Sequence, residues 1–220
     1  IILDGVFSHT GSDSIYFNKY GNYPEVGAYQ SVDSLYYNWY KFKKDRQEYE
    51  SWWGVDSLPE VNEMNSSYRQ FLYGSENSVV QKWLKVGVAG WRLDVADELP
   101  DEFIQELRQA IKSINPNAVL IGEVWEDASN KISYDSPRQY FLGDELDAAM
   151  NYPFRNSLLS FMLGQSDAKD VYQEIMSLYE NYPRENFYAA MNLIGSHDTN
   201  RVLTLLGNAP PEKSLTNTEQ

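Results

Sequence analysis

Three short apolar runs, each ending in an acidic residue, constrain the fold of this chain more than any other feature. They read GVAGWRLD, NAVLIGE and MNLIGSHD, and they end at Asp94, Glu123 and Asp198. Continuous apolar runs of this length, bounded by glycine or polar residues, are typical of strands that are buried on both faces of a sheet. If the three strands run parallel, their carboxylates lie at one rim of the sheet.

Segments with helical spacing alternate with the predicted strands. Residues 1–7, 88–95, 118–125, 147–154 and 191–197 predict strands, and residues 66–85, 100–114, 156–163, 168–179 and 201–206 predict helices. We also expect a short helix at residues 137–141 and a frayed tail around residues 209–211. Residues 8–65 form a long irregular segment rich in Gly and Tyr, and a connection of this length is normally functional.

The alternation favours an α/β fold with parallel βαβ units. A complete (β/α)₈ TIM barrel needs eight strands and about 250 residues, so five strands predict part of such a barrel, without its early strands and its last strand. An open doubly wound sheet is the alternative. It has less support, because no glycine-rich phosphate loop follows any of the strands.

The net charge of -14 limits the classes of partner. Nucleic acids and anionic membranes are disfavoured, because both bind basic surfaces, whereas a neutral sugar meets no such penalty. The absence of cysteine excludes disulfides and thiolate metal sites. No apolar run is long enough to span a bilayer. No leader is visible, but its absence means little, because the chain is expected to begin inside a domain. Cellular location and oligomeric state stay open.

Short motifs along the chain resemble the signature regions of the α-amylase family of glycoside hydrolases. DGVFSH at residues 4–9 resembles the first region, GWRLDVADE at 90–98 the second, GEVW at 122–125 the third and SHD at 196–198 the fourth. LPEVN at 58–62 resembles an additional region of neopullulanases and cyclomaltodextrinases. The family fold is a (β/α)₈ barrel with an insertion after its third strand. The resemblance therefore implies barrel strands three to seven, with residues 1–220 as a partial catalytic barrel and residues 8–65 as an inserted B-type subdomain.

Cleaving a glycosidic bond with retention requires a nucleophilic carboxylate and an acid/base carboxyl group about 5–5.5 Å apart. Neighbouring parallel strands are about 4.8 Å apart, so Asp94 and Glu123 on adjacent strands could meet this requirement. The resemblance implies that Asp94 is the nucleophile, that Glu123 is the acid/base and that Asp198 stabilises the transition state. It also implies hydrolysis of α-glucosidic bonds in starch-like glucans or maltooligosaccharides through a covalent glycosyl-enzyme. An isolated Asp at a strand end is more often a turn former or a helix cap.

Arg92 stands two residues before Asp94, so both side chains project to the same side of the strand. Its guanidinium would keep Asp94 ionised, although Arg92 could equally be a structural ion-pair partner. Glu123 must begin the reaction protonated. Burial and the neighbouring acids are expected to raise the pKa of Glu123.

Four further residues are candidates for substrate contact. The resemblance implies that His9 and His197 hydrogen-bond sugar hydroxyls. Asp4 lies within its strand and is expected to pair with Arg92. Trp125 either stacks on a sugar ring or fills the rim of the barrel. Trp52, Trp53 and the loop tyrosines are either sugar platforms or a local aromatic core.

Ser8 departs from the family pattern, which commonly has a calcium-binding Asn there. A serine hydroxyl is a poorer ligand for a hard cation than a carbonyl or a carboxylate. We therefore expect no cofactor, and Ser8 argues against a calcium ion at this point. Asp97 also stands where related sequences often carry Asn.

Two other functions remain as alternatives. Strand-end carboxylates could bind Mg²⁺ in a metal-dependent lyase or isomerase, although no lysine that could act as the base ends a strand. A non-catalytic amylase-like binding or assembly module is the second alternative, and the presence of all three acids argues against it. With three strands absent the barrel cannot close, so the isolated segment is expected to bind sugar weakly and to turn it over poorly.

Overall fold

The computed structural model describes residues 1–207, which divide into two compact units. The first unit contains Ile1–Glu123 and Leu142–Leu146. The second contains Val124–Phe141 and residues 147–207. The tail expected around residues 209–211 lies outside the described residues.

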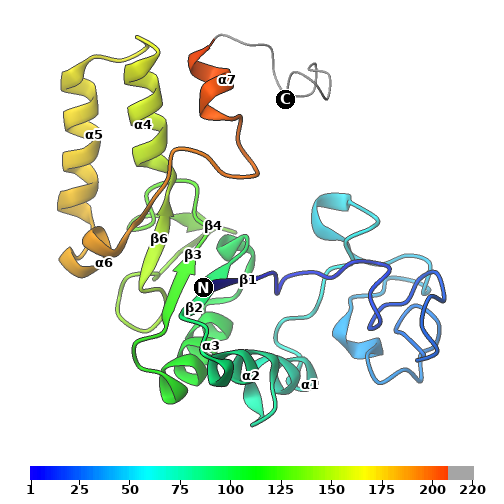
Figure 1. The fold of residues 1–220 in the computed structure, drawn as a ribbon. Coiled ribbons are helices and arrows are strands. Elements are labelled where there is room, and N and C mark those ends of the chain that lie inside the picture. The colour runs from blue at the N-terminus through cyan, green and yellow to red at the C-terminus, as the bar shows by residue number, and fades with distance from the viewer. Residues whose placement is uncertain (208–220) are drawn as a thin grey trace. The chain divides into compact units, whose positions relative to one another are not determined.

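Three parallel strands form the frame of the first unit (Figure 1). β1 pairs with β2 and β2 pairs with β3, in a register that places Leu93 opposite both Gly5 and Gly122. This arrangement confirms the parallel βαβ order predicted for residues 1–123. In chain order the unit contains β1 (Ile2–Gly5), 3₁₀ turns at Tyr37–Trp39 and Trp52–Gly54, α1 (Ser66–Arg69), a π-helical turn (Gln70–Gly74), α2 (Val79–Val86), β2 (Gly90–Leu93), a 3₁₀ turn (Ala96–Glu98), α3 (Asp101–Ile114) and β3 (Val119–Gly122).

The core of the first unit lies between this sheet and its helices. β2 is buried along its whole length, and α3 turns a row of fully buried apolar residues inward. These residues are Phe103, Ile104, Leu107 and Ile111, as the helical spacing predicts. Gly122 is required for close packing, because a Cβ atom there would lie 2.4 Å from Leu146 Cδ1. The segment Leu142–Leu146 therefore packs with the first unit although it follows β3 by some distance in sequence.

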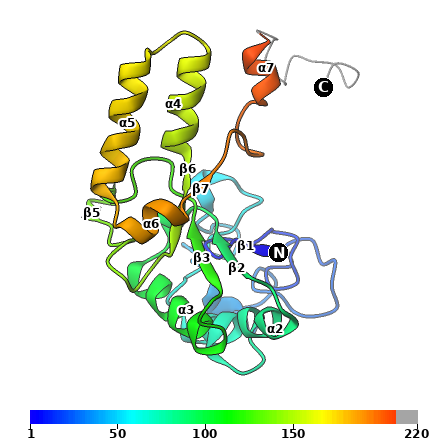
Figure 2. The ribbon, with the colours of Figure 1, turned by 60° about the vertical axis from the view of Figure 1, so that its left-hand side comes forward.

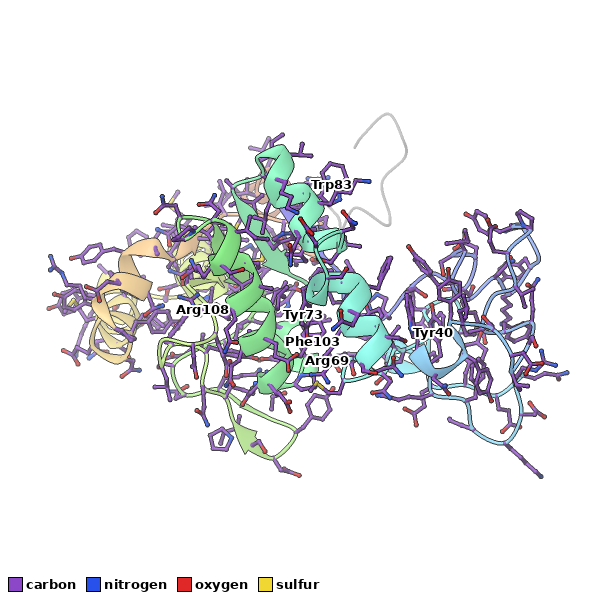
Figure 3. All side chains as sticks on the ribbon, turned by 90° about the horizontal axis from the view of Figure 1, so that it is seen from below. Tyr40, Arg69, Tyr73, Trp83, Phe103 and Arg108 are labelled. Atoms are coloured by element: carbon purple, nitrogen blue, oxygen red, sulfur yellow. The ribbon has the colours of Figure 1, made fainter. Side chains whose placement is uncertain are left out.

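The single helix predicted over residues 66–85 is wrong. The segment is divided into α1, the π-helical turn and α2, and the side chain of Asn65 caps α1. Side chains of α1 and of the π-helical turn contact Glu106 of α3. Arg69 Nη1 lies 2.7 and 2.8 Å from the two carboxylate oxygens of Glu106, and the Tyr73 hydroxyl donates to Glu106 Oε2 at 2.8 Å. Figure 3 labels Arg69 and Tyr73.

The inward face of α2 is narrow. Val80 and Leu84 are buried, but Trp83 is 43% exposed and points away from the core (Figure 3). Gly87 ends α2 in the left-handed conformation with φ of 105°.

The long segment after β1 builds an aromatic core of its own. The fully buried ring of Phe17 contacts the rings of Tyr29, Tyr40, Phe42 and Tyr49. This arrangement matches the local-core interpretation for those loop aromatics. Isolated bridges, such as His9 with Glu60 and Tyr40 with Val61, hold the segment without regular strands.

The second unit contains a helical hairpin and short strands. α4 and α5 lie side by side in both views (Figures 1 and 2). β6 and β7 pair in parallel, with Asn151 opposite Asn192. In chain order the unit contains β4 (Ile132–Ser133), β5 (Ser136–Pro137), β6 (Ala148–Asn151), α4 (Tyr152–Met162), α5 (Ala168–Asn181), α6 (Arg184–Ala189), β7 (Met191–Asn192) and α7 (Val202–Leu206).

Several predicted boundaries in this unit are wrong. The helix expected at residues 137–141 is replaced by the β4–β5 hairpin, and α6 was not expected. The strand predicted to reach residue 154 ends at Asn151, because the Asn151 side chain accepts the Phe154 N–H and so begins α4. Within residues 1–207, no helix combines the length and the apolarity needed to cross a membrane.

Candidate active site

The strand register brings the acids of the first unit together. Asp94 and Glu123 are the next residues after Leu93 and Gly122, which lie opposite each other on β2 and β3. Neighbouring parallel strands are about 4.8 Å apart, so the two acids leave the sheet side by side. Asp4 lies opposite Arg92 on β1 and β2 in the same sheet.

One guanidinium joins these residues. Arg92 Nη1 donates to Asp94 Oδ1 at 2.6 Å and to Asp4 Oδ1 at 2.7 Å, while its Nη2 lies 2.9 Å from Glu123 Oε2. The predicted pairing of Asp4 with Arg92 is therefore confirmed. Because Asp94 and Glu123 contact the two terminal nitrogens of the same side chain, their carboxyl groups face the same side of the sheet.

Arg92 stays charged despite its burial. Burial lowers the pKa of Arg92, but the hydrogen bonds to Asp4 and Asp94 and the charge of Glu123 outweigh this effect and raise it. The Glu123 side chain is only 4% exposed, so its contact with the guanidinium is shielded from water. Such a contact is screened much less by salt than an ion pair at the surface.

Strained backbone beside Asp94 donates a hydrogen bond to Glu123. The backbone N–H of Val95 donates to Glu123 Oε2 at 2.8 Å. Val95 adopts the left-handed conformation, with φ of 40° and ψ of 57°, which is rare for a β-branched residue. Strain of this kind gathers at functional sites, and nothing in the apolar run 88–95 signals it.

His9 follows β1 and begins an aromatic stack. Its ring stacks on Trp52 with centroids 5.4 Å apart, and Trp52 stacks on Trp53 at 5.5 Å. Trp53 is 80% exposed, and its indole N–H donates to Glu98 Oε1 at 3.1 Å. Burial lowers the pKa of His9, more than the nearby charges of Asp94 and Glu60 raise it, so the ring is neutral at neutral pH. Trp53 therefore lies on the surface, outside the aromatic core around Phe17.

Ser8 does not fit the role of a calcium ligand. Its side chain is buried, and its hydroxyl lies 2.9 Å from His9 Nδ1, where it is engaged with the imidazole. Over residues 1–207, no group of three or more His, Cys, Asp or Glu side chains is arranged to hold a metal ion.

The remaining predicted site residues belong to the second unit. Asp198 does not end a strand, because β7 stops at Asn192 and Asp198 lies on the loop that follows. His197 Nε2 lies 3.2 Å from Asp198 Oδ2, and both side chains are accessible, at 72% and 38% exposed. Trp125 is 40% exposed, and one face of its ring stacks on Tyr152 at a centroid distance of 4.0 Å.

Tyr152 and Ser196, which contact Trp125 and Asp198, were not predicted as site residues. The Tyr152 hydroxyl donates to Ser196 Oγ at 3.2 Å, and Ser196 Oγ also accepts the backbone N–H of Asp198 at 3.2 Å. Ser196 is part of the SHD motif, which could have marked it. Tyr152 stands inside a segment predicted as strand, where nothing distinguishes it from a core residue.

Comparison with known proteins supports the motif resemblance. The family model described as "Alpha amylase, catalytic domain" matches residues 1–218. An amylopullulanase from Thermoanaerobacterium saccharolyticum is 42% identical over 94% of this chain and 18% of its own length. Neopullulanase 2 from Thermoactinomyces vulgaris is 33% identical over 94% of this chain and 33% of its own length.

Solved structures support the predicted fold. The cyclic α-maltosyl-(1→6)-maltose hydrolase from Arthrobacter globiformis superposes with a TM-score of 0.79 and 28% identity, over 94% of this chain and 44% of that one. These matches confirm a partial (β/α)₈ barrel. The chain spans less than half the length of each of these relatives.

Proposed function

The chain belongs to the α-amylase family of glycoside hydrolases, and on this premise we propose that it forms part of a retaining glycosidase that cleaves α-glucosidic bonds. The observation that carries the proposal is the shared contact of Asp94 and Glu123 with the Arg92 guanidinium. Retention requires two carboxyl groups about 5–5.5 Å apart, and side-by-side positions on neighbouring parallel strands suit that spacing.

Asp94 is the nucleophile in this proposal. Its carboxylate attacks the anomeric carbon and forms the glycosyl-enzyme, from which water later releases the sugar. Arg92 Nη1 donates to Asp94 Oδ1 at 2.6 Å, which places a positive charge beside the attacking carboxylate. The same contact fixes the orientation of the carboxylate in a largely buried position.

Glu123 is the acid/base. Its Oε2 accepts the Val95 N–H and lies 2.9 Å from the positively charged Arg92 Nη2, and both contacts disfavour a proton on that oxygen. The transferable proton therefore belongs on Oε1, which gives it to the leaving oxygen and takes one back from water in the second step.

The other predicted residues bind and orient the sugar. His9, neutral because of its burial, offers a hydrogen bond to a hydroxyl, and the Trp52–Trp53 stack extends from it as a flat apolar surface. Within the second unit, Asp198 and His197 are accessible and Trp125 is partly exposed, and sugar contact is proposed for all three. Asp198 stabilises the positive charge of the transition state.

Starch-like glucans or maltooligosaccharides are the proposed substrates. The relatives are named amylopullulanase, neopullulanase 2 and cyclic α-maltosyl-(1→6)-maltose hydrolase. A net charge of -14 suits these neutral ligands and disfavours nucleic acid or an anionic membrane as a partner.

The test is Glu123→Gln in the full-length protein, assayed on maltooligosaccharides with a chelator present. The variant should lose about 10²- to 10⁴-fold in kcat, the usual contribution of general acid catalysis, while still binding maltooligosaccharide. Turnover of an α-maltosyl fluoride, whose leaving group needs no proton, should fall much less. Glu106→Gln is the matched control, because Glu106 pairs with Arg69 outside the site.

Each alternative function predicts a different result. Loss of all wild-type activity with the chelator would favour a metal-dependent lyase or isomerase. Sugar binding without turnover by the wild-type protein would favour a binding module. An unchanged rate for Glu123→Gln would refute the acid/base assignment.

A further inference from the structure

One buried side chain of the second unit contacts Trp125 directly and is linked to Asp198 through Ser196. Tyr152, the first residue of α4, is fully buried. Its ring stacks on Trp125 with an interplanar angle of 10°, and its hydroxyl donates to Ser196 Oγ at 3.2 Å. Ser196 Oγ accepts the N–H of Asp198, so a continuous chain of contacts runs from Trp125 to the backbone of Asp198.

The backbone around Tyr152 is well fixed. Asn151 caps α4 through the Phe154 N–H, and its side-chain amide donates to Asn192 Oδ1 on the neighbouring strand at 2.9 Å. Tyr152 therefore sits at a junction of β6, α4 and the β7 side of the unit, where its position is set by strand pairing and by the helix cap.

The loop that carries Asp198 has few other anchors among the described residues. The N–H of Ser196 donates to Thr199 Oγ1 at 3.0 Å, which closes the turn on itself. Arg155, also on α4, reaches the Asn200 carbonyl at 3.5 Å, the outer limit for a hydrogen bond. The Tyr152–Ser196 contact is thus a short link between this turn and the first turn of α4.

The orientation of the Trp125 ring also depends on Tyr152. Tyr152 covers one face of the indole, and the 40% exposure of Trp125 shows that part of its surface remains accessible. Because Tyr152 packs against one face of the Trp125 ring, the ring has a fixed orientation and can stack on a sugar at little entropic cost.

We propose that Tyr152 is a positioning residue of the glycosidase site, which backs the Trp125 platform with its ring and orients Asp198 through Ser196 with its hydroxyl. The proposal rests on the proposed function. Transition-state stabilisation depends on placing the charged group accurately, so a loosened Asp198 loop lowers kcat more than it weakens substrate binding.

Three variants of the full-length protein separate the two contacts. Tyr152→Phe keeps the stacked ring and loses the hydroxyl, so kcat on maltooligosaccharides should fall about three- to tenfold with KM within about twofold. Ser196→Ala should give a similar loss, and the double variant should be no worse than either single variant. Tyr152→Leu removes the stack as well and should also raise KM.

Two controls test whether the loss of kcat in Tyr152→Phe acts through Asp198. Tyr182→Phe removes another buried tyrosine hydroxyl of this unit, one that accepts the Ala128 N–H at 3.0 Å, and it should lower the thermal midpoint without changing kcat. In an Asp198→Ala background, measured with an activated aryl maltooligosaccharide, Tyr152→Phe should cause no further loss of kcat/KM.

The outcomes distinguish this inference from the function on which it rests. An unchanged kcat for Tyr152→Phe, a full loss that persists in the Asp198→Ala background, or an equal loss for Tyr182→Phe would each overturn the positioning role. If the wild-type protein cleaves no α-glucan and Glu123→Gln changes nothing, the proposed function itself fails.

Discussion

Glu63, which directly follows the LPEVN motif, offers a quantitative test of how burial acts on a charge in this protein. The residue is only 6% exposed, and burial raises the pKa of its carboxyl group to about 7 from a usual value of 4.5. A backbone hydrogen bond and the charge of Lys41 oppose this shift without cancelling it. Glu63 is therefore largely neutral at mildly acidic pH.

The magnitude follows from the difference between folded and unfolded values. A shift of one pKa unit corresponds to 1.36 kcal/mol, so the shift of Glu63 corresponds to about 3 kcal/mol at most. Because the folded value is the higher one, this stabilisation is fully present below about pH 4.5 and is lost as the pH rises through about 7. Glu63→Gln keeps the shape of the side chain and removes its titration.

The assay is guanidinium unfolding of the full-length protein and the Glu63→Gln variant at a series of pH values from 4.5 to 8. The free energy of unfolding of the variant should gain about 3 kcal/mol relative to wild type over this range. Glu48→Gln, an exposed glutamate of the same insertion, is the matched control and should run parallel to wild type. Curves for Glu63→Gln and wild type that stay parallel across the range would refute the reasoning.

Two further predictions concern the sheet. Arg92→Leu should cost about 3–5 kcal/mol in the free energy of unfolding, because it leaves the largely buried carboxylate of Asp94 without its cation and removes the Arg92 contact of Glu123. The value of kcat should fall with it. Arg92→Lys restores a charge and should recover stability more than activity. Equal stability of Arg92→Leu and wild type by chemical unfolding would contradict this. Gly90→Ala should cost about 3 kcal/mol by the same measurement, since its Cβ would lie 2.1 Å from the Val119 carbonyl oxygen; a loss below about 0.5 kcal/mol would show that β2 and β3 separate easily.

The pairing of the two central acids could be predicted from sequence because it depends on local pattern. Apolar runs predicted the strands that end before Asp94 and Glu123. Parallel pairing of these strands then places the two acids side by side. Asp198 shows the limit of that argument. The run from residue 191 to 197 is apolar enough to suggest a strand, yet only Met191 and Asn192 find a partner in β6.

Other features depended on contacts between distant residues and could not be read from periodicity. The break in the helix predicted at residues 66–85 coincides with the contacts of Arg69 and Tyr73 to Glu106, which lies more than 30 residues further along the chain. The early start of α4 depends on Asn151, whose capping role competes with its place in a strand. The position of Tyr152 between Trp125 and Ser196 follows from tertiary packing alone.

The left-handed torsion angles of Val95 have a consequence for engineering. Glycine would adopt them without steric conflict, so a laboratory search for heat-tolerant variants would be drawn to this residue. The same exchange would keep the N–H that donates to Glu123 but would make the backbone around it more flexible, so the Glu123 carboxyl group would sample more orientations. Replacing Val95 by glycine is therefore expected to raise thermal stability and to lower kcat. Variants selected for stability at this residue would be less active.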